Sequence, residues 1–123
     1  MYRRLMTACV PAIFVAAIAA APAAAERSCG WISVSSISYH VQVTHGNVSC
    51  KEARSLIKTY GEGGGTLHNP HGSQSQMYST LSGGWTCASG AGGAHGCRRG
   101  KRTNGHFSDE VWGLEKFEWE RHH

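Results

Sequence analysis

Four of the five cysteines in this 123-residue chain lie beyond residue 25, at positions 29, 50, 87 and 97. An even number of cysteines in a short exported chain is typical of a disulfide framework. A domain of this length buries only about two-thirds of the surface of its unfolded chain. Each disulfide contributes about 2–5 kcal/mol, against a total stability of about 5–15 kcal/mol. We therefore expect two disulfides to compensate for a small hydrophobic core.

The first 25 residues have the pattern of a secretory signal peptide. Two arginines precede an uncharged, alanine-rich stretch that ends in three alanines at residues 23–25. The strongly apolar part is short for a membrane span, which needs about 20 residues. We expect cleavage between Ala25 and Glu26, a secreted or cell-envelope location, and a single monomeric domain over residues 26–123 with no membrane span. Cys9 would leave with the leader.

Residues 36–61 predict a strand followed by a helix. Apolar and polar residues alternate over 36–43, as in a half-buried strand. Ser49 and Glu52 form a capping box, and Gly61 is a natural helix end. One helical face carries the apolar residues Cys50, Ala53, Leu56, Ile57 and Tyr60. We expect this helix to pack on the apolar face of the strand.

The remaining segments are short and rich in glycine. We expect a long polar loop over 61–77, a strand that ends at Cys87, a flexible connection over 88–96, a strand from Cys97, a basic turn over 98–105 and a strand over 106–108. Residues 109–121 fit either a helix or a strand, and their apolar spacing favours the helix. The sequence therefore predicts an α+β fold, with one packed helix at about 50–60 on a small antiparallel sheet, stapled by disulfides.

Three disulfide connectivities are possible for four cysteines. We favour Cys50 with Cys87 and Cys29 with Cys97, which would tie the helix to the sheet. Pairing of sequence neighbours, Cys29 with Cys50 and Cys87 with Cys97, is the alternative. A reactive thiolate at Cys50 is also conceivable because a helix N-terminus lowers the pKa of a thiol. The exported location and the three other cysteines favour a disulfide.

The order of these motifs resembles a group of small secreted proteins of actinobacteria and other high-GC bacteria. Such proteins carry a v-s-C-x-x-A-x-x-l helix, a g-[WYF]-x-C segment and a final cysteine. The matching residues here are Ser49, Cys50, Ala53, Leu56, Trp85, Cys87 and Cys97, within residues 37–107. The resemblance implies an α+β disulfide domain and carries no catalytic residue.

One compact basic cluster stands out in a chain of mild charge. The net charge of +4 falls by two arginines when the leader is removed, which is too little to require a nucleic-acid partner. The candidate anion-binding patch consists of Arg98, Arg99, Lys101 and Arg102. It could hold a phosphate group, nucleic acid or an anionic cell-surface polymer. The alternative is a solvated turn balanced in part by the acidic C-terminal segment.

The histidines and tryptophans carry no recognisable motif. The histidines considered are His68, His71, His95, His106, His122 and His123, and none shows metal-ligand spacing such as H-E-x-x-H. The sequence therefore assigns no catalytic, cofactor-binding or metal residue. Among the four tryptophans, Trp85 is expected in the core and Trp119 is expected to be the most exposed.

Three functions remain open at this point. The leading hypothesis is a non-enzymatic extracellular binding module, with an anionic polymer or a protein as its partner. The first alternative is a small secreted hydrolase that acts on RNA, for which Glu62, His106 and Arg99 supply the required residue types. The second alternative is an inhibitor of another secreted enzyme that presents loop 61–76 or 88–96. These loops are too rich in glycine for a rigid inhibitory loop, so this hypothesis ranks last.

Overall fold

The computed structural model of the protein describes residues 26–73 and 76–123. The expected leader, residues 1–25, lies outside the described residues. Within the described ranges, seven strands form one antiparallel sheet, in the order β1-β2-β7-β6-β5-β4-β3. The strands are β1 (Arg27–Val34), β2 (Ile37–His45), β3 (Thr66–His68), β4 (Tyr78–Leu81), β5 (Trp85–Ser89), β6 (His95–Thr103) and β7 (His106–Glu115). The helices are α1 (Cys50–Gly61), the 3-10 turn η2 (Ala91–Gly93) and α2 (Lys116–His122).

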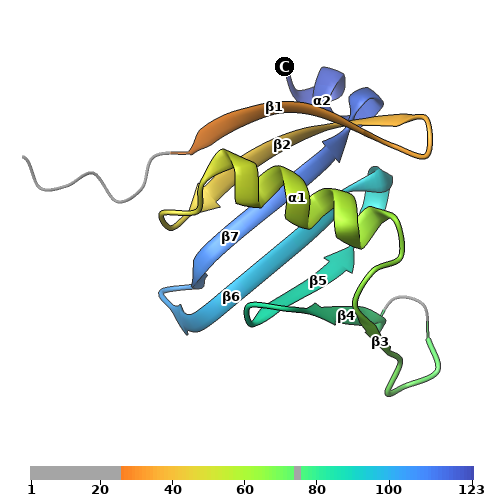
Figure 1. Ribbon diagram of the computed structural model, residues 1–123, viewed down its shortest axis with the longest axis vertical. Helices are drawn as coiled ribbons and strands as arrows, with labels where there is room; N and C mark the ends of the chain where they lie inside the picture. Colours follow the sequence, from red (N-terminus) through yellow and green to blue (C-terminus); the bar gives the residue numbers. More distant parts are fainter. Residues whose placement is uncertain (1–25, 74–75) are drawn as a thin grey trace, which may run out of the picture.

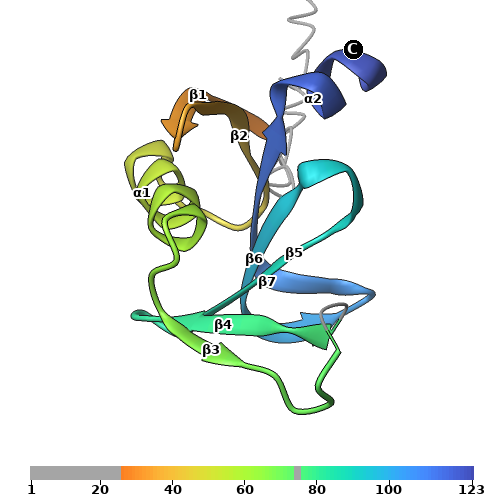
Figure 2. The same cartoon turned by 90° about the vertical axis from the view of Figure 1, so that its right-hand side faces the viewer.

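The C-terminal strand β7 lies in the interior of this sheet, third from the β1 edge. It pairs with β2 on one side and with β6 on the other, as Figure 1 shows. Within the described sheet, the N-terminal hairpin β1–β2 is therefore hydrogen-bonded to the β3–β6 meander through β7. Helix α2 continues beyond the end of β7 (Figure 2).

Helix α1 packs against one side of the sheet, as its apolar stripe predicts. Ala53, Leu56 and Ile57 are buried, and the buried valines of β2 and β7 contribute to the same core. Gly113 of β7 allows a close approach, because a Cβ atom at this position would lie 2.6 Å from Cγ2 of Ile57. Among the described residues, Figure 2 shows α1 on this side and no helix over the middle strands on the other side.

The N-terminus of α1 confirms half of the predicted capping box. The Ser49 hydroxyl accepts a hydrogen bond from the backbone N–H of Glu52, at 3.1 Å. The Glu52 carboxylate does not return to the cap. It accepts instead from the indole Nε1 of Trp85 and from Arg99, each at 3.3 Å. Glu52 therefore links the first turn of α1 to β5 and β6.

The strand and helix predicted over residues 36–61 are present as β2 and α1, whereas five expected segments need correction. The predicted strand 77–87 is a hairpin of two strands, β4 and β5, and the polar loop 61–77 contains β3. The connection 88–96 is partly taken up by the ends of β5 and β6, and most of the basic turn 98–105 belongs to β6. The favoured helix over 109–121 begins only at Lys116, because 109–115 pair with strands on both sides.

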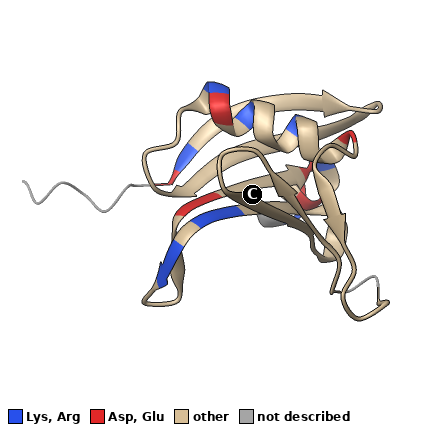
Figure 3. Ribbon diagram, turned by 60° about the horizontal axis from the view of Figure 1, so that its bottom comes forward, with Lys and Arg blue, Asp and Glu red and all other residues tan. Residues whose placement is uncertain are grey.

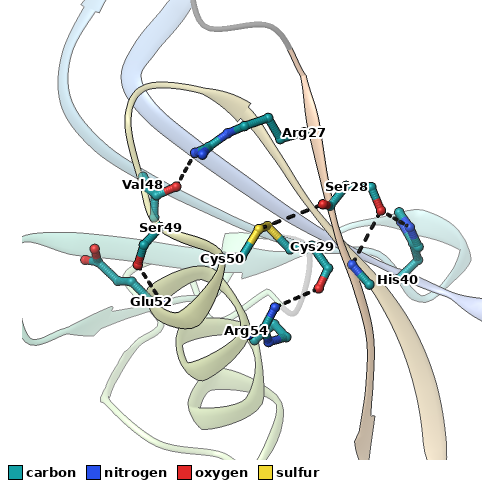
Figure 4. Close-up of a disulfide and its surroundings, with 10 residues drawn as sticks. Arg27, Ser28, Cys29, His40, Val48, Ser49, Cys50, Glu52 and Arg54 are labelled. Carbon is teal, nitrogen blue, oxygen red and sulfur yellow. Dashed lines mark hydrogen bonds between the residues drawn. A yellow bond between two sulfur atoms is a disulfide. The ribbon is translucent and has the colours of Figure 1, made fainter.

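The disulfides join Cys29 to Cys50 and Cys87 to Cys97. The favoured pairing was therefore wrong, and the neighbour pairing is the one present. Strand order explains the result: β5 and β6 form a hairpin in which Cys87 lies directly opposite Cys97. The edge strand β1 passes beside the N-terminus of α1, where Arg54 also donates a hydrogen bond to the carbonyl of Cys29 (Figure 4).

None of the helices among the described residues is long and apolar enough to span a membrane.

Candidate functional site

The face of the sheet opposite α1 carries a groove. Val111 and Gly113 of β7 face α1, so alternation along the strand places Glu110 and Trp112 on the other, open face. A hollow of about 260 Å³ opens there. We call it the open-face groove and define it by Tyr78, Ala88, Arg98, Phe107, Glu110 and Trp112.

Aromatic rings and one guanidinium group dominate the open-face groove. The guanidinium carbon of Arg98 lies 4.7 Å from the centre of the Phe107 ring, within the range of a cation–π contact. Trp112 is 37 % exposed, and its ring crosses Gly96, where a Cβ atom would come within 2.7 Å. The groove therefore combines flat apolar surfaces with a positive charge.

The structure divides the expected basic patch between the two faces of β6. Arg99 lies on the α1 side, where its Nε donates to Asp109 at 2.9 Å and its guanidinium lies 4.3 Å from the Trp85 ring. Arg98, Lys101 and Arg102 are exposed. Figure 3 shows the basic positions following one another along this strand. Arg99 therefore helps to hold α1 against the sheet. Of the four residues of the basic patch, the exposed Arg98, Lys101 and Arg102 are available to a ligand.

Beside the groove, two histidines and a glutamate form a cluster that the sequence did not reveal. Nδ1 of His45 lies 3.8 Å and Nδ1 of His106 lies 3.5 Å from Oε2 of Glu110. The two imidazole rings stack with their centres 4.1 Å apart. The three residues come from the end of β2 and the first half of β7. We call them the His–Glu cluster.

The carboxylate of Glu110 is held on both of its oxygens. Oε1 accepts the backbone N–H of Phe107 at 2.8 Å, and Oε2 faces the two imidazoles and the Thr44 hydroxyl at 3.5 Å. Burial by itself would raise the pKa of Glu110. The Phe107 N–H and the two histidines outweigh burial and hold that pKa below its ordinary value. Glu110 is therefore a fixed anion on the groove wall.

The three residues suggested for RNA hydrolysis are not brought together. Glu62 follows the last turn of α1, whereas Arg99 reaches Glu52 in its first turn, so about 15 Å of helix separates them. His106 lies at the start of β7 and turns toward Glu110. Only His106 of the proposed three lies beside the groove.

The other histidines are dispersed over the described part of the chain. His68 stacks on Tyr78 and bonds to the Thr80 hydroxyl, and His71 is exposed in the following turn. His123 stacks on Trp119.

The tryptophans differ from the expectation at Trp119. This residue stacks on His40 and is partly buried, so the expectation that it is the most exposed tryptophan was wrong. Trp31 and Trp112 are the exposed ones, and Trp85 is buried as expected.

His95 belongs to a separate polar group at the far end of α1. Its ring stacks on Tyr39 and meets the edge of Tyr60, and its Nδ1 lies 3.1 Å from the Ser89 hydroxyl. Burial lowers the pKa of His95, although the backbone at Ala94 and the charge of Glu115 act in the opposite direction. His95 is therefore held in its neutral form.

This lowered pKa predicts a loss of stability in mild acid. The unfolded chain binds a proton on His95 below about pH 6.5, before the folded chain does, so stability falls as the pH drops through that range. We expect His95→Gln to reduce the slope of stability against pH between about 7 and 5.5, measured by urea denaturation. The slope that remains would come in part from His40, whose pKa is also lowered by burial. An unchanged slope in His95→Gln, with His71→Gln as control, would contradict the assignment.

Comparison with protein-family models, curated proteins and solved structures gives no match for this chain. The candidate site therefore rests on the residues described above.

Proposed function

We propose that this protein is an exported, disulfide-stabilised binding module that holds an anionic extracellular polymer in the open-face groove. One observation carries the proposal: the Arg98 guanidinium lies over Phe107 in a hollow that also exposes Trp112. The charge-patterned leader and the two disulfides support export. The sequence resemblance to small secreted actinobacterial proteins is a further reason to propose export.

The chemistry of the groove fits a polymer that alternates flat units with anionic groups. Aromatic side chains provide stacking surfaces that tolerate many sequences, and a nearby guanidinium neutralises a phosphate, sulfate or carboxylate. Lys101 and Arg102 follow Arg98 on the same strand and are exposed, so they extend the positive charge beyond the groove. Such an arrangement favours salt-sensitive binding.

Binding to a single-stranded oligonucleotide and to an acidic polysaccharide tests the proposal. We expect Arg98→Ala to weaken binding about 10-fold at low salt, and to reduce the slope of log affinity against log salt by about one. Lys58→Ala is the matched control, because it removes an equal charge from an exposed position on α1. Equal effects of the two substitutions, or no binding of either polymer, would contradict the proposal. Trp112→Ala should weaken binding of the oligonucleotide more than of the polysaccharide if bases stack in the groove.

Hydrolysis of RNA is the second candidate function, and one contact favours it. The imidazole of His106 lies 3.5 Å from the Glu110 carboxylate, on the same part of the sheet as Arg98. A carboxylate, an imidazole and an arginine are the groups that phosphodiester cleavage needs as base, acid and phosphate ligand. The binding assay separates the two functions, because a hydrolase would shorten the RNA oligonucleotide and His106→Ala would stop the cleavage. If the RNA stays intact, hydrolysis is excluded and only the binding function remains.

A further inference from the structure

We propose that the His–Glu cluster is a binding site for a divalent transition-metal ion of the zinc class. His45, His106 and Glu110 each offer one ligand atom, and these atoms lie within 4.8 Å of one another. Two imidazole nitrogens and a carboxylate oxygen are the donor set of many zinc sites that keep one position open. The site is distinct from the open-face groove, although Glu110 lies on the wall of both.

The distances suit a tetrahedral ion. Zinc bonds to nitrogen and oxygen of about 2.0–2.1 Å place neighbouring ligand atoms about 3.3 Å apart in a tetrahedron. The two observed nitrogen-to-oxygen distances, 3.8 Å for His45 and 3.5 Å for His106, are close to that value. A shared ion also requires the stacked rings to tilt, so that each nitrogen points at it. The side chain of His106 is 55 % exposed, which leaves room for this rotation.

One ligand nitrogen has no hydrogen-bond partner. Nδ1 of His45 is shielded from solvent and makes no hydrogen bond, because Glu110 is too distant to accept one. A buried polar atom of this kind costs free energy unless a partner satisfies it. A metal ion between the two imidazoles and Oε2 would provide that partner.

The carboxylate ligand already has the supporting contacts that metal sites use. Oε1 of Glu110 is fixed by the Phe107 N–H, and Thr44 donates from its hydroxyl to the carbonyl of residue 110 and to Oε2. Hydrogen bonds to a metal-ligating side chain fix its orientation, and losing them typically lowers metal affinity about 10- to 100-fold. The site is therefore organised around one oxygen, Oε2, which faces both imidazoles.

The ligand atoms select the class of ion, because nearby charge acts alike on all divalent cations. Lys101 lies on the wall of the hollow that His45 and His106 line, and its positive charge opposes a cation. Calcium and magnesium require several oxygen ligands, of which this cluster supplies one carboxylate. Nitrogen donors favour zinc, copper and nickel. We therefore expect zinc to bind and calcium and magnesium not to bind.

A zinc titration of the oxidised protein, purified without a histidine tag and freed of metal with a chelator, tests the proposal. Calorimetry with zinc alone should show one ion per chain, and His106→Ala and Glu110→Gln should each weaken binding at least about 10-fold. The Nδ1 signals of His45 and His106 should shift in nitrogen-15 NMR spectra. His71→Ala and His123→Ala are matched controls that remove histidines outside the cluster, and both should bind as the parent does.

Two results would overturn the proposal: no binding of one zinc ion per chain, or binding that survives His106→Ala. Because the His106 ring is more than half exposed, this variant should keep its metal-free melting temperature, and it decides the matter even if Glu110→Gln fails to fold. The titration contains no polymer, so its outcome is independent of the proposed binding function. Zinc on these atoms would also occupy the groups that RNA hydrolysis needs, so it should inhibit any cleavage.

Discussion

Replacing both Cys29 and Cys50 by alanine is expected to lower the free energy of unfolding by about 3 kcal/mol. This disulfide closes a separation of 21 residues, and removing it returns the entropy of that loop to the unfolded chain. It also removes the covalent link between the edge strand β1 and the N-terminus of α1, where the hydrogen bonds from Arg54 to the carbonyl of residue 29 and from Arg27 to the carbonyl of Val48 would remain. Chemical denaturation of the oxidised variant measures the loss.

The second disulfide provides the matched comparison. Cys87 and Cys97 are separated by only 10 residues and already lie opposite each other in the β5–β6 ladder. Their closed loop is shorter, so the entropic effect of removing this bridge is smaller. Hydrogen exchange should show early opening of β1 in the Cys29/Cys50 variant and not in the Cys87/Cys97 variant. Equal protection of β1 in both would show that the first bridge does not anchor this strand.

Trp85→Ala is expected to lower the free energy of unfolding by about 3–5 kcal/mol. Trp85 is 2 % exposed, and it contacts three partners at once: the core, the Glu52 carboxylate and the Arg99 guanidinium. Truncation leaves a cavity between α1 and β5, and it removes the indole N–H that Glu52 accepts. Urea denaturation followed by circular dichroism measures the loss.

Two further variants separate the causes of this loss. Trp85→Phe keeps a ring in the core but removes the N–H, so we expect a smaller loss of about 1–2 kcal/mol. Trp112→Ala removes a tryptophan from the open face, where 37 % of the residue is exposed, and should cost less than Trp85→Ala. A larger loss of stability for Trp112→Ala than for Trp85→Ala would mean that the main core lies on the open face of the sheet, which would contradict the structure.

Local sequence patterns predicted the elements that depend on local interactions. The alternation over 36–43 predicted β2, and the capping serine with the apolar stripe predicted α1. Both elements present their apolar residues to the same core, so the local preference and the tertiary packing agree. The coarse architecture, a helix on an antiparallel sheet with two disulfides, followed from these patterns.

A strand from Cys97 and another over 106–108 were expected, but the full length of the β6–β7 hairpin escaped prediction because its strands are unusual. Three arginines, one glycine and one lysine over 98–103 are typical of a turn, but here they belong to β6, where Arg98 and Arg99 lie on opposite faces and Arg99 is paired to Asp109. In 109–115, apolar residues lie on both faces of the strand, which obscures the two-residue period. Pairing with β2 and β6 decides the conformation of this segment, and no local pattern encodes it.

The His–Glu cluster was missed for the same reason. His106 and Glu110 are four residues apart and share a face in any continuous strand or helix, but the expected strand over 106–108 and the expected helix from 109 placed them in different elements. His45 lies far away in the sequence and joins them through the pairing of β2 with β7. Strand order also determined the disulfide pairing, which cysteine spacing alone left open among three connectivities.

The position of β7 between β2 and β6 has a consequence for the order of assembly. Until residues 106–115 emerge from the ribosome, the β1–β2 hairpin and the β3–β6 meander have no strand between them. Contacts between distant parts of a chain form slowly because they close long loops. A nascent chain without residues 106–115 therefore lacks the strand that links these two parts, and the native sheet closes only after β7 has been added.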